Sequence, residues 1–406
     1  MWKVSALPPA GSDELRVSGR SGFYRLTARQ TYDFGRASEW ISSWRIRFSD
    51  GALWPRNTPR TLESIDHNSN VPSKGTRFDR PELDVLRFLA FLMVFFSHAF
   101  HSRLFDGGGF GVEVFFLLSA YLITTLLLLE KEKTGDIAAG RFYARRIFRI
   151  WPVYYLTLLV AVGLRIAGRD GMTGRFLALF LLPIGNWACV TWGFPNSLIA
   201  PLWSVSVEEQ FYLAWPFLMR RWLYRLPQIA IGLILVACAA RGVLVWIGAG
   251  RTATWCNTFA QLDSIATGAL VGYYLNGRLP RISAFVRLIF ASVSALAFPL
   301  AILYGDVSGV KCLATYPIVT AASLGLLLAF LGLPVPNRLW LRYPGKISYG
   351  LYAYHLAVLR ILPQFRHRWL VALLLTGLIA AISYELLERP ILRYKERFAI
   401  IRSRAA

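Results

Sequence analysis

The most regular feature of this chain is a series of apolar stretches that begins near residue 83 and continues almost to the C-terminus. Most hold close to the ~20 residues that an α-helix needs to cross about 30 Å of hydrocarbon, and short polar loops separate them. The pattern predicts an all-α, polytopic membrane bundle of about ten transmembrane helices. The expected spans are residues 83–101, 109–129, 150–167, 208–222, 227–248, 257–275, 283–304, 312–333, 346–363 and 369–388.

One further apolar segment, residues 176–190, is short and interrupted by Pro183 and Gly185, so it is either re-entrant or a poor eleventh span. Lysine and arginine concentrate in cytoplasmic loops. If residues 176–190 do not cross and the N-terminus lies inside, most basic loops fall on the cytoplasmic side, with Arg241, Arg251 and the basic tract at residues 366–368 as exceptions. We therefore expect ten spans with both termini cytoplasmic. The basic loops are residues 130–149, 219–225, 276–281, 337–346 and 393–398.

The chain divides into three parts by composition. Residues 1–75 are polar, rich in Ser and Arg, and lack the apolar core of a signal peptide, so we expect little fixed structure there. One hypothesis is that this segment is a start-site artefact and that translation begins at Val71. Residues 76–398 form the expected membrane domain, and residues 399–406 form a basic tail.

Overall composition supports the membrane interpretation. Hydrophobic residues make up 55% of the 406 and charged residues only 17%, which is unlike a soluble domain. The net charge of +22 comes mostly from arginines in loops, and no soluble basic domain is present to bind nucleic acid, so the lipid bilayer is the expected partner. The four cysteines lack metal-ligand spacing, and no metal is expected.

Several ionisable residues fall inside the expected spans, where they are costly and suggest function. His98 follows Arg87 by eleven residues, about 16 Å along a helix. Glu113 opens the second span, and Glu208 and Glu209 enter from the same side, so these carboxylates approach the depth of His98. A histidine oriented by a carboxylate can act as a general base. A lone histidine is more often a core residue, but this coincidence favours catalysis.

A second layer of charge lies at the inner face, where the third span is preceded by Arg145, Arg146 and Arg149. Such a cluster either binds lipid headgroups or forms a docking site for a phosphate-bearing ligand. Farther along the chain, Asp263 and His355 are intramembrane candidates for a pocket, although a buried hydrogen bond explains Asp263 equally well. The chain contains no phosphate-binding glycine loop and no G-x-S-x-G elbow.

Six segments resemble one known family, the integral-membrane acyltransferase family 3 of the polysaccharide O-acetyltransferase type. The resemblance covers roughly residues 80–395, and the order of the segments makes it specific. They are "LDVLRFLAFLMVFFSHAF", "GVEVFFLLSAYLIT", "RFYARRIFRIWPVYYL", "PLWSVSVEEQFYLAWPFL", "GKISYGLYAYHLAVL" and "SYELLERPILR".

The resemblance implies an acyltransferase of the multi-pass type in the inner (plasma) membrane. Its donor would be cytoplasmic acyl-CoA, usually acetyl-CoA, and its acceptor a hydroxyl of a surface or exported carbohydrate or of a glycolipid. The family's arginine, ten residues, histidine motif falls on Arg87 and His98, and its R-x-x-R motif falls on Arg146 and Arg149.

These matches lead to assigned roles. His98 is the expected general base, assisted by Glu113 or Glu208. Two departures from the family pattern are Glu113 in place of aspartate and Ser119-Ala120-Tyr121 in place of Ser-Gly-Phe. The residues expected to bind the donor are Arg87, Arg145, Arg146 and Arg149, and those expected to line the substrate pocket are Ser206, Glu209, Asp263, Tyr352 and His355.

The main alternative is a transporter or flippase of glycolipids or polysaccharide precursors, since intramembrane carboxylates and histidine also build proton relays. Transporters often show two related halves, and we see no such internal repeat here. The sequence leaves the acceptor open among polysaccharide, peptidoglycan, glycolipid and a small metabolite.

Overall fold

The computed structural model describes residues 3–6, 14–19, 22–27, 78–100, 108–336 and 339–401. The chain divides into two compact units, Met1–Ser69 and Asn70–Ala406. The first unit contains an antiparallel sheet in the order β1-β2-β3, formed by β1 (Lys3–Ala6), β2 (Glu14–Gly19) and β3 (Gly22–Thr27). Most of residues 1–75 lie outside the described residues, so the expectations about their order and their translation stay predictions.

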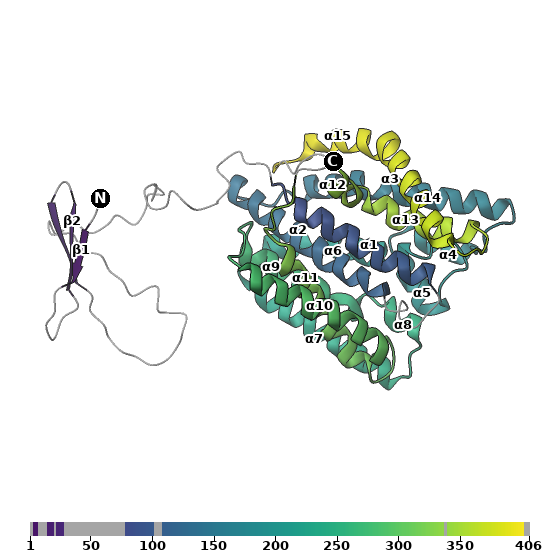
Figure 1. Ribbon diagram of the computed structural model, residues 1–406, viewed down its shortest axis with the longest axis horizontal. Helices are drawn as coiled ribbons and strands as arrows, with labels where there is room; N and C mark the ends of the chain where they lie inside the picture. Colours follow the sequence, from purple (N-terminus) through teal and green to yellow (C-terminus); the bar gives the residue numbers. More distant parts are fainter. Residues whose placement is uncertain are drawn as a thin grey trace. The chain divides into compact units, whose positions relative to one another are not determined.

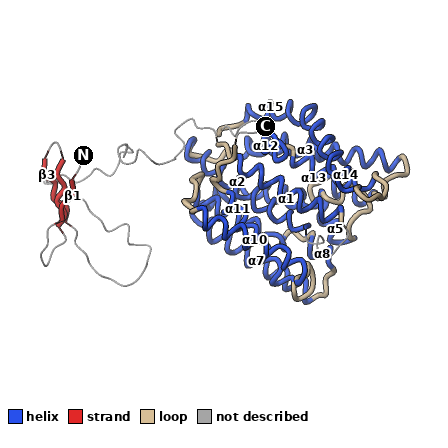
Figure 2. The backbone as a smooth tube through the Cα atoms, viewed as in Figure 1, coloured by secondary structure: helices blue, strands red, loops and turns tan. Residues whose placement is uncertain are grey.

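In its described residues, the second unit is built almost entirely from helices (Figures 1 and 2). Short 3-10 turns η1 (Gly108–Phe110), η2 (Leu223–Arg225), η3 (Phe259–Gln261) and η5 (Glu396–Phe398) and a π-helical turn η4 (Tyr384–Glu388) join or extend them. The α-helices are α1 (Pro81–Ala99), α2 (Gly111–Thr134), α3 (Ala139–Ile166), α4 (Gly174–Leu181), α5 (Gly185–Trp192), α6 (Leu202–Trp222), α7 (Leu226–Trp246), α8 (Arg251–Trp255), α9 (Leu262–Leu275), α10 (Ala284–Tyr304), α11 (Cys312–Phe330), α12 (Leu339–Lys346), α13 (Ser348–Ile361), α14 (Arg368–Ser383) and α15 (Arg389–Lys395).

The prediction of a helical membrane protein is confirmed. Each of the ten expected spans overlaps a helix, and within the described part of the chain six stretches are long and apolar enough to cross a membrane. The count of ten and the cytoplasmic termini stay predictions. The six stretches are Gly111–Thr134, Ala139–Ile166, Leu202–Trp246, Ala284–Ala301, Cys312–Phe330 and Arg368–Lys395.

Residues 176–190 do not form one continuous helix. The break around Pro183 separates α4 from α5, and each of these eight-residue helices is about 12 Å long, too short to cross about 30 Å of hydrocarbon. Helix α3 supports the break, because the hydroxyls of Tyr154 and Tyr155 donate hydrogen bonds to the carbonyls of Phe180 and Leu181 at 2.7 and 3.1 Å. Carbonyls at the end of α4 are thereby satisfied.

Helix α1 lies inside the helical unit and contacts α2, α11, α12 and α13 (Figure 1). Glycine permits two close approaches near it. Gly268 of α9 packs against the backbone of Leu117 in α2, and Gly345 of α12 packs against the backbone carbonyl of Asp84 in α1. Small residues allow membrane helices to approach in this way. The second contact brings α12 against the first turns of α1.

Candidate active site

A cavity of about 230 Å³, partly open to the surface, lies among α1, α2, α3, α6, α12, α13 and α15. Its wall is strongly basic, with seven Arg or Lys side chains and three carboxylates. Apolar residues such as Val112, Phe115 and Phe116 cover another part of the wall. The basic residues are Arg80, Arg87, Arg146, Arg149, Arg342, Lys346 and Lys395, and the acidic ones are Asp79, Asp84 and Glu208.

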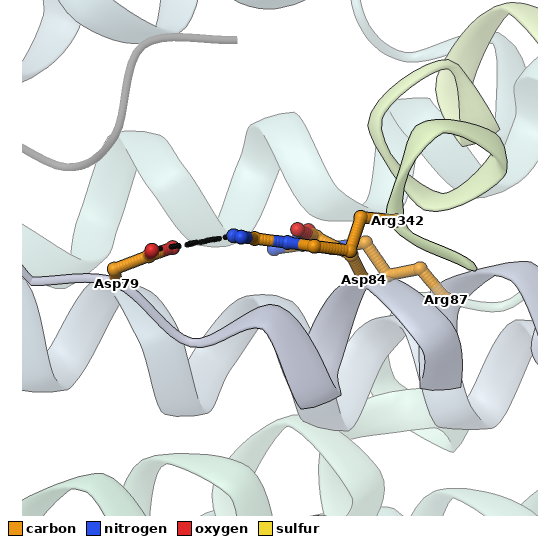
Figure 3. A network of polar contacts seen from close by, with 4 residues as sticks. All are labelled: Asp79, Asp84, Arg87 and Arg342. Atoms are coloured by element: carbon orange, nitrogen blue, oxygen red, sulfur yellow. Dashed lines mark hydrogen bonds and ion pairs between the residues drawn. The ribbon is translucent and has the colours of Figure 1, made fainter. Parts of the chain in front are cut away.

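Two ion pairs lie side by side at the start of α1 (Figure 3). Arg87 Nη1 donates to Asp84 Oδ1 at 2.9 Å within α1. Arg342 of α12 donates from Nη2 to both carboxyl oxygens of Asp79 at 2.9 and 3.2 Å. The second pair connects α12 to the segment that precedes α1, so both segments are held at the cavity.

Arg146 and Arg149 differ from these paired arginines. Both line the cavity from α3, and no carboxylate of the described residues lies within ion-pair distance of either. The guanidinium carbon of Arg146 lies 5.5 Å from the centre of the Phe142 ring and 5.6 Å from that of Tyr212, so stacking holds the side chain. Two cations that face a cavity and form no direct ion pair with a described carboxylate can bind an external anion.

Arg145 directly precedes Arg146 in the sequence, but its side chain is held by contacts outside the cavity. It forms an ion pair with Glu130, a carboxylate that is 2% exposed, and donates from Nη1 to the carbonyl of Phe398 at 2.9 Å. Its side chain does not line the cavity. Of the four arginines predicted to bind the donor, three therefore line the cavity, and Arg145 instead connects α3 to α2 and to the C-terminal segment.

Glu208 is the predicted carboxylate that reaches the cavity. Ser119 Oγ donates to its Oε1 at 2.9 Å, and the Tyr212 hydroxyl donates to its Oε2 at 2.8 Å. Ser119 thus has a partner that the sequence pattern alone did not indicate. The two hydrogen bonds orient the carboxylate beside the basic wall.

Glu113 and Asp263 lie elsewhere, in a buried cluster formed by α2, α7 and α9. Arg241, whose side chain is fully buried, pairs with Asp263 at 2.9 Å and donates to the carbonyl of Ala260 at 2.7 Å. The charges of both residues act on the Glu113 carboxyl group. Neither Glu113 nor Asp263 lines the cavity. The cluster also explains why Arg241 departs from the loop-charge pattern, since it is neutralised inside the bundle.

His98 and His355 form a pair. His98 is exposed in the last turn of α1, and His355 is fully buried in α13. His355 Nε2 lies 3.3 Å from His98 Nδ1, and the ring centres are 5.0 Å apart. In the described part of the chain, no hydrogen bond or ion pair joins His98 to Glu113 or Glu208. Among the described side chains, a second imidazole therefore faces His98 Nδ1.

Tyr352 connects this histidine pair to the cavity. Its ring centre lies 5.7 Å from that of His355, and its side chain lines the cavity. The hydroxyl is 2.7 Å from Ser204 Oγ, also in the wall, and donates to the carbonyl of Pro201 at 3.0 Å. A continuous series of contacts therefore runs from the basic cavity through Tyr352 and His355 to His98.

The remaining predicted pocket residues lie outside the cavity wall. Ser206 Oγ donates to the carbonyl of Leu202 within α6 at 3.3 Å, and Glu209 Oε2 accepts from Trp151 Nε1 at 3.5 Å. No group of three or more His, Cys, Asp or Glu that could hold a metal occurs among the described residues.

Residues of α12 are the main feature that the sequence interpretation missed. Arg342 and Lys346 both line the cavity, but their loop was interpreted only as a topology signal. Their spacing of four residues was the available clue, because such residues share one face of a helix. Pro344 and Gly345 between them obscured the helix that presents them.

The fold and site together define a helical membrane protein with a cavity whose wall is rich in basic side chains. A family model described as an acyltransferase domain matches residues 80–387, and the chain belongs to this family, acyltransferase family 3. The resemblance found in the sequence is confirmed.

Relatives of known name match over most of the chain. The peptidoglycan O-acetyltransferase OatA of Listeria monocytogenes is 28% identical in an alignment of 358 positions that covers 78% of this chain and 57% of the relative. The O-acetyltransferase OatA of Staphylococcus aureus is 25% identical in an alignment of 346 positions that covers 77% of this chain and 57% of the relative. The chain thus spans just over half the length of these relatives. No solved structure is significantly similar to it.

Proposed function

We propose that the protein is a membrane-embedded O-acyltransferase of the plasma membrane. It would move an acyl group, by preference acetyl, from cytoplasmic acyl-CoA to a hydroxyl of a cell-envelope carbohydrate. The family match and the names of the relatives support the reaction class. The observation that carries the proposal is the pair of cavity arginines, Arg146 and Arg149, which form no direct ion pair with a carboxylate of the described residues.

The basic wall suits the diphosphate and ribose phosphate of coenzyme A, because arginine binds phosphate through two parallel hydrogen bonds. At about 230 Å³ the cavity is smaller than the ~300–1,000 Å³ of pockets that enclose whole drug-sized ligands, so it would hold only part of the donor. Phe115 and Phe116 on the apolar wall could contact the pantetheine arm. Arg87 and His98 are about 16 Å apart along α1, a distance that an extended pantetheine arm bridges.

His98 is the proposed general base. Its Nε2 takes the proton from the acceptor hydroxyl while the oxygen attacks the thioester carbonyl. The new C–O bond forms, the C–S bond breaks, and the proton then passes to the coenzyme A thiolate. General-base assistance of this kind contributes typically about 10² to 10⁴ in rate.

The test is transfer of radiolabelled acetyl from acetyl-CoA to glycans in membranes that contain the protein. We expect His98→Ala to lower transfer by about 10² to 10⁴, since it removes the base. His367→Ala, at an exposed histidine just before α14, is the matched control and should transfer normally. Normal transfer by His98→Ala would disprove the assigned base, and absence of any labelled glycan with the wild type would favour a transporter.

A further inference from the structure

We infer that His355 is a positioning residue that holds the His98 ring in its proton-accepting orientation, so that a second imidazole orients the proposed base. This inference rests on the proposed role of His98. It gives His355 a role different from the pocket-lining one predicted from the sequence.

The tautomer of His355 follows from its contacts. Its Nδ1 lies 2.6 Å from the carbonyl oxygen of Tyr352, and a carbonyl only accepts hydrogen bonds, so Nδ1 carries the hydrogen. In the neutral ring the lone pair is then on Nε2, the atom that faces His98. The ring is fully buried and lies edge-on to Phe91, with centres 6.1 Å apart. His355 therefore presents a fixed acceptor to His98.

The Nδ1–H group of His98 needs this acceptor because the other nearby acceptor, the carbonyl oxygen of Val94, is already occupied. His98 Nδ1 also lies 2.9 Å from the carbonyl oxygen of Val94. That oxygen already accepts from Ser97 Oγ at 2.7 Å, and helix geometry directs the backbone amide of His98 to it as well. A carbonyl has two lone pairs, so His355 Nε2 is the acceptor whose lone pair is available. With Nδ1–H bound, the lone pair of His98 is on Nε2.

The pair also suits the charge that develops during catalysis. When His98 takes a proton, its Nδ1–H bond to His355 becomes charge-assisted and therefore stronger. A neutral partner avoids the desolvation cost of a second buried charge before the reaction. The backbone carbonyl of Tyr352 accepts the hydrogen bond from His355. The hydroxyl of Tyr352 is in turn held by the Ser204 hydroxyl and the Pro201 carbonyl.

His355 does not line the cavity, since Tyr352 lies between them. Its loss should therefore reduce turnover without changing donor binding. This separates a positioning role from a pocket role, which would change the KM for acetyl-CoA.

The experiment compares His355→Leu and His355→Gln with the wild type in the acetyl-transfer assay. Leucine removes the acceptor, whereas the glutamine amide can both accept from His98 and donate to the Tyr352 carbonyl. We expect His355→Leu to lower kcat roughly 10- to 100-fold, by analogy with the loss seen when the group that orients a metal-binding histidine is removed, with an unchanged KM for acetyl-CoA. His355→Gln should recover most of that kcat, and the control His367→Leu should match the wild type.

Several outcomes would overturn the inference. These are a normal kcat in His355→Leu, a raised KM with normal kcat, or no recovery in His355→Gln. If the leucine variant does not purify as a monodisperse protein, His355→Phe fills similar volume without accepting a hydrogen bond and replaces it. Adding His355→Leu to His98→Ala should cause no further loss, because the two act as one unit. An active His98→Ala would contradict the proposed function, whereas an inactive His98→Ala beside a fully active His355→Leu would contradict this inference alone.

Discussion

Replacement of Arg146 by alanine tests whether the cavity binds the donor phosphates. Arg146 lies over the rings of Phe142 and Tyr212 and forms no direct ion pair with a carboxylate of the described residues. Its removal therefore breaks no ion pair of the described residues. The main loss falls on binding of an external anion.

The expected size of the effect follows from one charge-assisted interaction. A hydrogen bond to a charged group contributes about 1.5–3 kcal/mol, and each ~1.4 kcal/mol is a factor of ten in affinity. The Kd for acetyl-CoA should rise roughly 10- to 150-fold. Arg87 and Arg149 remain in the wall, so we expect a value toward the lower end. Arg146→Lys keeps the charge but loses the planar guanidinium that forms two parallel hydrogen bonds, so its Kd should lie between those of the wild type and Arg146→Ala.

The measurement is equilibrium binding of labelled acetyl-CoA to the detergent-purified protein, since KM equals Kd only when chemistry is slow. Arg141→Ala is the matched control, because Arg141 is exposed on the same helix and does not line the cavity. Unchanged affinity in Arg146→Ala, or an equal loss in Arg141→Ala, would show that the cavity is not the donor site.

Two further predictions concern packing. Arg241→Met leaves Asp263 without its ion-pair partner in the bundle and should lower the free energy of unfolding by roughly 3–5 kcal/mol, and adding Asp263→Leu should restore much of that loss. Thermal unfolding in detergent measures the stability of both variants. An equal loss in the single and the double variant would contradict the pairing. Gly345→Val forces a side chain against the Asp84 carbonyl and should displace α12, which would weaken acetyl-CoA binding several-fold. Gly377→Val is the control and should leave binding unchanged, because the added side chain enters open space. Equal binding by the two variants would contradict a role for α12.

Features that depend on one helix could be predicted from the sequence. The length and apolarity of each stretch indicated the helices, because hydrocarbon requires every backbone group to bond within its own segment. Arg146 and Arg149 are three residues apart and so share a helix face, which was enough to expect both at one site. The resemblance over residues 80–395 agrees with the matched family region, residues 80–387.

Features that depend on contacts between neighbouring helices could not be predicted from the sequence. Glu113 and Glu208 enter the bundle from the same expected side. Glu113 nevertheless lies in the buried cluster with Arg241, whereas Glu208 lines the cavity, because the direction of each side chain follows the rotation of its own helix. Arg145 and Arg146 are adjacent but diverge by about 100° around α3, a consequence of 3.6 residues per turn. Which direction meets the cavity is a property of the packed bundle.

The sequence by itself determined that this protein is a helical membrane protein of the acyltransferase family, with Arg87, His98, Arg146 and Arg149 as its main candidates for chemistry. Only the tertiary structure decided which charged groups meet. It brought His355 to His98 across 257 residues, and Arg342 and Lys346 to the cavity. The physical reason is that helix formation follows from local composition, whereas contacts between helices depend on how side chains pack across the whole bundle.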